Sequence, residues 1–265
     1  MKRFLSILAA LGLGVATAAH STVTFVGSAP ANDGTNHALS ASAAFTISGG
    51  SLTIVLTNTD LASGAYSNPW GLTGLFWDFT NSQTLTASSA AVASGAILTP
   101  TACNSGAGCA TATNVGGEFG YQKGSYNGGA PTGIGGYGIA SSGYLRGDAN
   151  FGGPNLDNPL ALDGPNFSIV GKNSTGLTPT NPSIKEKVTF VLTGISGVTE
   201  ANIFNIRFQY GTNFSESRFT GCLTTQTGCT SVRDTPNRVP EPTSLALVGV
   251  ALLGAAATQR RLAQT

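Results

Sequence analysis

The chain has 265 residues and a net charge of +1, and only 9% of its residues are charged, against about 25% in an average protein. It therefore lacks the basic surplus of nucleic-acid binders, the high net charge of disordered chains and the charged heptads of coiled coils. Its 36 glycines, 25 serines, 33 threonines and 18 asparagines indicate a neutral, polar, turn-rich chain.

The N-terminal 19 residues have the pattern of a secretory signal peptide. Lys2 and Arg3 precede the apolar stretch Phe4–Val15, and the small residues Ala16–Ala19 follow it. A charged start, a short apolar core and a small-x-small site are what signal peptidase recognises. A membrane anchor is the alternative, but the core is too short to span about 30 Å of hydrocarbon. We predict that residues 1–19 are removed during export.

Residues 20–237 are expected to form a single exported domain. Apolar residues alternate with threonine or other polar residues over 52–57, 188–193 and 204–210, which is the pattern of half-buried strands. Further candidate strands are Thr22–Val26, Ala43–Ile47, Leu72–Phe79, Gly135–Ala140 and Phe167–Val170. The sequence predicts an all-β, single β-sandwich or jelly-roll-like domain with long Gly-rich loops. A short helix is expected only at Ala87–Ala96.

Two tryptophans are the candidates for ligand binding. An exposed Trp70 or Trp77 could stack on a sugar ring, and Asp78 between Trp77 and Phe79 is a carboxylate of the kind that glycosidases use. On a strand, however, Trp77 and Phe79 share one face and Asp78 lies on the other. The two aromatic side chains are therefore expected in the core, and ligand binding is the alternative.

The chain offers little material for a nucleophilic enzyme. It has two histidines, His20 and His37, and neither a G-x-S-x-G nor an H-E-x-x-H motif. A Ser-His-Asp mechanism would have to use His37, whose neighbours Asn32, Asp33 and Asn36 are ordinary for a surface loop. We expect no enzymatic activity from this residue.

The segment Thr99–Gly143 is rich in glycine and is expected to form long loops around one or two strands. Such loops can carry a binding site on a rigid scaffold. They can equally be a flexible insertion without a specific role.

All four cysteines lie in the exported part, where disulfides form by default. Their spacing favours two local bridges, Cys103–Cys109 and Cys222–Cys229. A zinc site from four thiolates would need C-x₂-C-type spacing, which these pairs do not have.

The loop between Asp148 and Asn166 has the densest group of oxygen ligands in the chain. Asp148, Asn150, Asp157 and Asp163 supply the carboxylate and amide oxygens that calcium prefers. The same residues, with glycine and proline, are also common in ordinary turns. Calcium is the one cofactor that the sequence suggests.

The C-terminal segment 238–265 has three parts. Pro240–Glu241–Pro242 is followed by the apolar run Leu245–Ala257 and then by Arg260–Arg261. Thirteen residues form a helix of about 20 Å, short for a membrane span, and a buried core helix is the alternative. The isolating prolines and the terminal arginines favour a transient anchor in the inner membrane, with the arginines on the cytoplasmic side.

These three parts together resemble the PEP-CTERM sorting signal of Gram-negative bacterial exoproteins. The resemblance implies a tail that is recognised and removed by exosortase, a membrane-embedded transpeptidase related to cysteine proteases. It further implies a final location at the cell surface or in the extracellular matrix, where such proteins are commonly linked to exopolysaccharide and biofilm.

The leading expectation is an exported, non-enzymatic surface or matrix protein associated with exopolysaccharide. A carbohydrate-binding or adhesive module is the first alternative, and a polysaccharide hydrolase is the second. Expected partners are signal peptidase, exosortase, exopolysaccharide and, before processing, the membrane; nucleic acid is not expected because there is no basic surplus.

Overall fold

The computed structural model describes residues 21–31, 33–98, 113–124, 133–142, 156, 167–178 and 181–234. Strands form nearly all the regular structure of these residues, which contain no α-helix and only short 3₁₀ turns. The predicted all-β class is therefore confirmed. The predicted signal peptide and the C-terminal apolar helix lie outside the described residues.

The elements follow one another in a simple order. The strands are β1 (Thr22–Pro30), β2 (Ala38–Ser48), β3 (Ser51–Asn58), β4 (Gly64–Ser67), β5 (Leu72–Phe79), β6 (Thr86–Ala91), β7 (Ile97–Leu98), β8 (Gly120–Lys123), β9 (Tyr137–Ala140), β10 (Ser168–Val170), β11 (Ser174–Thr178), β12 (Ser183–Lys185), β13 (Lys187–Thr193), β14 (Ile203–Tyr210), β15 (Arg218–Thr220) and β16 (Cys222–Leu223). The 3₁₀ turns are η1 (Asn68–Trp70), η3 (Gly116–Glu118) and η4 (Glu200–Asn202).

A six-stranded antiparallel sheet has the order β16-β1-β2-β3-β13-β6. Its central strands alternate between buried and partly exposed positions, as the sequence pattern predicts. The buried positions are apolar except for Asn58, and the partly exposed ones are mostly serine or threonine. β2 and β3 form a hairpin in which Ser48 pairs with Ser51. The two residues between them, Gly49 and Gly50, both have positive φ, the conformation that tight two-residue hairpins require.

An eight-stranded mixed sheet has the order β15-β14-β5-β10-β12-β7, with β9 and β8 continuing from β5. The pair β10–β12 is parallel and the other pairs are antiparallel. Strand β5 is buried along nearly its whole length, because both of its faces are covered. A separate two-stranded parallel ribbon joins β4 and β11.

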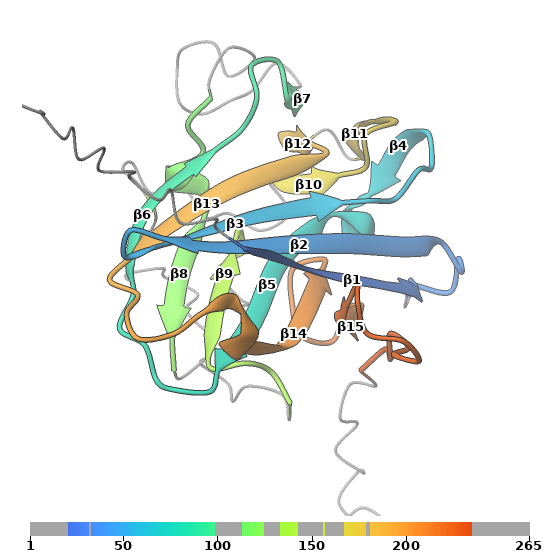
Figure 1. The fold of residues 1–265 in the computed structure, drawn as a ribbon. Helices are drawn as coiled ribbons and strands as arrows, with labels where there is room; N and C mark the ends of the chain where they lie inside the picture. Colours follow the sequence, from blue (N-terminus) through green and yellow to red (C-terminus); the bar gives the residue numbers. More distant parts are fainter. Residues whose placement is uncertain are drawn as a thin grey trace, which may run out of the picture.

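The two sheets contribute to one hydrophobic core. In Figure 1, β1, β2, β3 and β13 lie in front of β5, β8 and β9 and run across them. Phe45 on β2 contacts Trp77 on β5, with ring centroids 6.0 Å apart. At another point Phe190 on β13 meets Phe119, with centroids 4.9 Å apart. Tyr210 on β14 also donates a hydrogen bond of 2.8 Å to the carbonyl of Ser40 on β2.

Two details differ from the sequence prediction. The helix expected at Ala87–Ala96 is wrong, because Thr86–Ala91 is the strand β6 that pairs with β13. Pairing with an apolar neighbour strand outweighs the helix propensity of an Ala/Ser run.

The second difference lies in β14. The expected alternation of Phe204, Ile206, Phe208 and Tyr210 fails at Phe204, which is 46% exposed. A register shift between Phe204 and Arg207 and a positive φ at Asn205 mark a bulge, which reverses the direction of the side chains that precede it.

Candidate functional site

Several predicted site residues lie outside the described residues. These are Asp148, Asn150, Asp157 and Asp163 of the suggested calcium loop, the bridge Cys103–Cys109, and the tail with Pro240, Glu241, Pro242, Arg260 and Arg261. The calcium site and the first bridge therefore stay predictions. Within the described part of the chain, no group of three or more His, Cys, Asp or Glu side chains is placed to hold a metal ion. No helical segment in that part has the length and hydrophobicity of a membrane span.

The expectation of an exposed ligand-binding Trp77 is wrong. Its side chain is 0% exposed and packs between Phe45 and Tyr137. The strand geometry noted above explains this, because Trp77 and Phe79 both face the core and leave Asp78 on the other side. The carboxylate of Asp78 has a structural role: it accepts hydrogen bonds from the Gly136 amide and from Asn205 in the bulge, both of 2.7 Å.

Trp70 is half-buried and belongs to a cluster centred on His37. The His37 ring lies flat on the Trp70 indole, with centroids 3.8 Å apart and an interplanar angle of 4°. The imidazole Nε2 donates to Oδ2 of Asp60 at 2.5 Å. The side chains of His37 and Asp60 are only 13% and 6% exposed. The sequence neighbours of His37 predict an ordinary surface loop. The structure instead places His37 in a largely buried polar cluster.

The neighbouring groups hold this cluster in place. The second carboxylate oxygen of Asp60 accepts the Ala62 amide at 2.8 Å, and the Asp60 amide donates to Asn58. The indole Nε1 of Trp70 donates to Asp33 at 2.6 Å. The turn between β1 and β2 is thereby bound both to the end of β3 and to η1, which leads into the eight-stranded sheet.

The electrostatics of the cluster are set by burial and by one carboxylate. Burial raises the pKa of Tyr66 above its ordinary value, and the charge of Asp60 raises it further. Tyr210, which is completely buried, has its pKa raised by the same two causes in the same order. For Asp33, slight desolvation raises the pKa, but the hydrogen bonds from Thr35 and Trp70 outweigh it, so that the net pKa is lowered.

This geometry connects segments that lie far apart in the sequence. Among the described residues, no serine, threonine or cysteine side chain hydrogen-bonds the His37 ring, so the pair with Asp60 is not completed as in a catalytic triad. Sequence reasoning missed the cluster because His37 and Asp60 are 23 residues apart and lie in no recognisable motif. Only their burial distinguishes them from ordinary loop residues.

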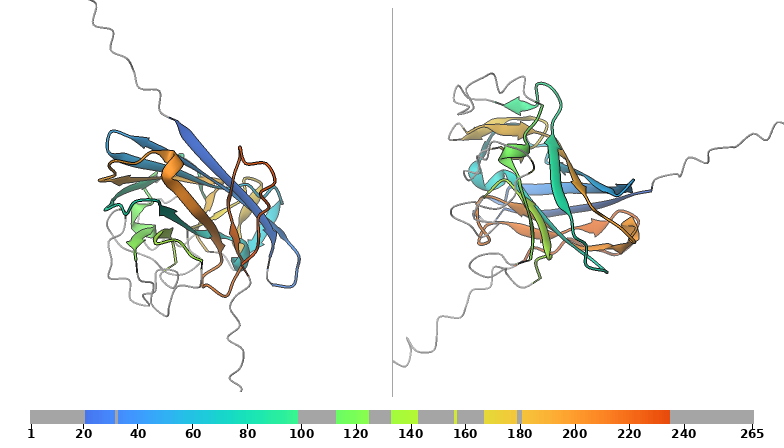
Figure 2. Two further views of the ribbon diagram at one scale, coloured as in Figure 1. Left: turned by 60° about the horizontal axis from the view of Figure 1, so that its bottom comes forward. Right: turned by 90° about the vertical axis from the view of Figure 1, so that its left-hand side faces the viewer.

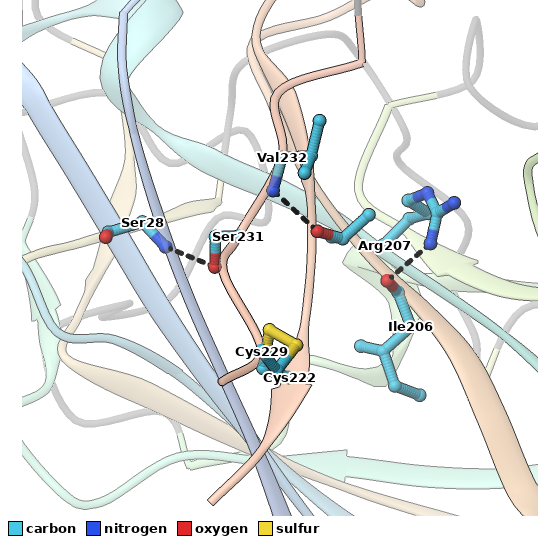
Figure 3. Close-up of a disulfide and its surroundings, with 8 residues drawn as sticks. Ser28, Ile206, Arg207, Cys222, Cys229, Ser231 and Val232 are labelled. Carbon is cyan, nitrogen blue, oxygen red and sulfur yellow. Dashed lines mark hydrogen bonds between the residues drawn. A yellow bond between two sulfur atoms is a disulfide. The ribbon is translucent and has the colours of Figure 1, made fainter. Parts of the chain in front are cut away.

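A second feature is the C-terminal strap, residues Cys222–Asp234. The predicted Cys222–Cys229 disulfide is confirmed and is drawn in Figure 3. Strand β15 belongs to the eight-stranded sheet and β16 to the six-stranded one, so the chain crosses from one sheet to the other just before the disulfide. Gly27 permits this close passage, since a Cβ there would lie 2.7 Å from the Thr220 carbonyl oxygen.

The far end of the strap returns to β15 and is bound there. Thr220 and Val232 exchange two hydrogen bonds, and the Asp234 amide donates to the Arg218 carbonyl. The Asp234 carboxylate accepts from Nε of Arg218 at 2.7 Å and of Arg207 at 3.2 Å. Arg218 is 2% exposed, so Asp234 neutralises a buried charge. Figure 2 (left) shows this red-orange segment beside the blue strand β1.

Comparison with known proteins identifies the tail. Residues 238–261 match the family model of the PEP-CTERM protein-sorting motif, which confirms the resemblance inferred from Pro240–Glu241–Pro242 and Arg260–Arg261. No curated protein and no solved structure matches the chain. The motif implies an exported protein that exosortase processes and sorts to the cell surface.

We predict that His37 stabilises the fold chiefly by donating a hydrogen bond to the buried Asp60 carboxylate. The variant His37→Phe keeps a flat ring on Trp70 but leaves a buried carboxylate short of a donor. It should lower the free energy of unfolding by about 2–4 kcal/mol. Adding Asp60→Asn removes the unpaired charge and should restore part of that loss. Urea denaturation of the two variants and the wild type measures both changes. Equal losses with and without Asp60→Asn would contradict this role.

Alkaline pH should destabilise the protein through its buried tyrosines. Below about pH 10 the Tyr66 and Tyr210 hydroxyls are protonated in both the folded and the unfolded state. Above it the unfolded chain releases protons that the folded protein retains, so the free energy of unfolding falls as pH rises. Urea denaturation between pH 8 and 11 should show a shallower fall in Tyr210→Phe. Ionisation of all six tyrosines near pH 10, with an unchanged circular dichroism spectrum, would contradict the raised pKa of Tyr66 and Tyr210.

Proposed function

We propose that the protein is an exported, non-enzymatic component of the cell surface or extracellular matrix that associates with exopolysaccharide and biofilm. The observation that carries this proposal is the PEP-CTERM motif at residues 238–261. In this proposal residues 1–19 are a signal peptide, residues 20–237 are the exported domain, and residues 238–265 anchor the chain in the inner membrane until exosortase removes them.

We further propose that the exported domain is a β-sandwich. The core cluster that both sheets share supports this architecture, as do hydrogen bonds that run between the sheets. Besides the bond from Tyr210 to Ser40, the side-chain amide of Asn58 on β3 donates to the Ile169 carbonyl on β10 at 2.9 Å. A disulfide at the C-terminal edge suits the oxidising compartments outside the cytoplasm.

The described residues favour a structural role over the two alternatives. A carbohydrate-binding module that works by stacking needs exposed aromatic side chains, and Phe204 is the one aromatic among the exposed large hydrophobic residues of the described part. For a hydrolase, the candidate carboxylate of Asp78 already accepts hydrogen bonds from two protein donors, and the buried Asp60 is bound in the same way. The polar outer faces of the strands remain suited to hydrated polysaccharide.

The proposal predicts a chain trimmed at both ends. The intact mass of the exported form should lack residues 1–19 and most of the segment after Pro242, and this form should fractionate with exopolysaccharide. Glu241→Ala should retain the tail and leave the protein with the inner membrane. Full-length wild-type chain found in washed membranes, with none outside the cell, would contradict the proposal.

A further inference from the structure

We propose that the C-terminal strap limits how far the sorting motif can reach from the folded domain, and so regulates its delivery to exosortase. This inference rests on the proposed function, because it concerns how the same motif meets its enzyme. It follows from the short stretch of sequence between Asp234, which the strap binds to the domain, and Pro240–Glu241–Pro242.

The strap fixes the last described residue to the body of the protein. Asp234 is bound by its amide to β15 and by its carboxylate to Arg207 and Arg218. Two residues earlier, Val232 is bound to Thr220 on β15. The chain is therefore bound to the domain as far as Asp234, and not only as far as the end of β16.

Chain length then bounds the reach of the motif. Only residues 235–239 separate Asp234 from Pro240, and a chain spans at most about 3.6 Å per residue. Pro240 can therefore lie no more than about 22 Å from Asp234. A membrane-embedded enzyme can reach the motif only when this edge of the domain lies close to the membrane surface.

Releasing the strap would lengthen that tether. If residues 230–234 detach, Cys229 becomes the anchor point, and the maximum distance from the anchor point to Pro240 rises to about 40 Å. The disulfide stops further release, since Cys222 lies in β16 and pairs with Val26 on β1. The disulfide and the Asp234 pairs thus define a short and a long state of the tether.

Beyond Cys229 the strap is held by hydrogen bonds and ion pairs, which single substitutions can remove. Figure 3 shows Ser231 bound to the Ser28 amide, a hydrogen bond of 3.1 Å at the protein surface. A groove of about 490 Å³ is lined by residues of the strap, such as Thr230, and of β1 and β2, such as Val26 and Ser40. Val232 is 59% exposed. The segment after Cys229 therefore depends on polar contacts and not on apolar packing.

The test combines a shorter spacer with a weaker strap in the full-length chain. Deleting residues 235–237 leaves the matched motif 238–261 intact and reduces the maximum distance between Asp234 and Pro240 to about 11 Å. Thr220→Val removes the acceptor for the Val232 amide, and Asp234→Ala removes the ion pairs. Replacing residues 235–237 by Gly-Ser-Gly is the matched control, since it changes the sequence and keeps the length.

Tail removal is followed by pulse-chase in cells that carry exosortase. The deletion should slow processing about tenfold, because a tether too short to span abolishes the encounter. Adding Asp234→Ala, alone or together with Thr220→Val, should restore the rate to near that of the wild type, while Gly-Ser-Gly should process normally. Two strap variants are used so that one that fails to fold, detected by its loss from the exported fraction, does not decide the result.

Three outcomes would overturn the inference. Normal processing of the deletion would show that reach is not limiting. A deletion that folded strap variants do not rescue, or a Gly-Ser-Gly control that is equally slow, would assign the effect to the spacer sequence. A wild-type tail that exosortase never removes would refute the proposed function, and the inference with it; Glu241→Ala identifies that case, because it would then behave like the wild type.

Discussion

Most of the described structure depends on the one core in which the six-stranded and the eight-stranded sheet bury their apolar side chains. With only 9% charged residues, the chain can form few surface ion pairs, and such pairs contribute little to the free energy of unfolding. Apolar side chains from both sheets instead bury one another, with Phe45, Trp77, Phe190 and Phe208 all 0% exposed. Burial of each such side chain contributes about 2–3 kcal/mol, which must offset the backbone entropy of a long, glycine-rich chain.

Each of the few buried charged side chains has a partner and connects a turn or terminal segment to the sheets. Asp60 with His37 binds the β1–β2 turn to η1. Glu200 accepts hydrogen bonds from Ser21 and from the Ile47 amide, both of 2.7 Å, and so holds η4 near the start of β1. Arg218 with Asp234 fixes the C-terminal strap. An unpaired buried charge is costly, so these contacts specify where the chain turns as well as stabilising it.

The sequence predicted those features that depend on local pattern. Strands such as β3 and β13 follow from period-two alternation, the Cys222–Cys229 bridge follows from short spacing in an exported chain, and the tail follows from three adjacent sequence features. The sequence indicated a helix for β6 because alanine is a strong helix former, whereas its strand state depends on pairing with β13. The bulge at Asn205 and the cluster of His37 with Asp60 depend on contacts between distant segments, which no single stretch of sequence encodes.

Cooperative unfolding tests the central claim, that both sheets depend on one shared core. Scanning calorimetry of the exported, trimmed protein should show a single transition whose calorimetric enthalpy equals the van't Hoff enthalpy, because neither sheet can keep its inner face buried without the other. Two separate transitions, with one sheet melting while the other keeps its circular dichroism signal, would contradict the account.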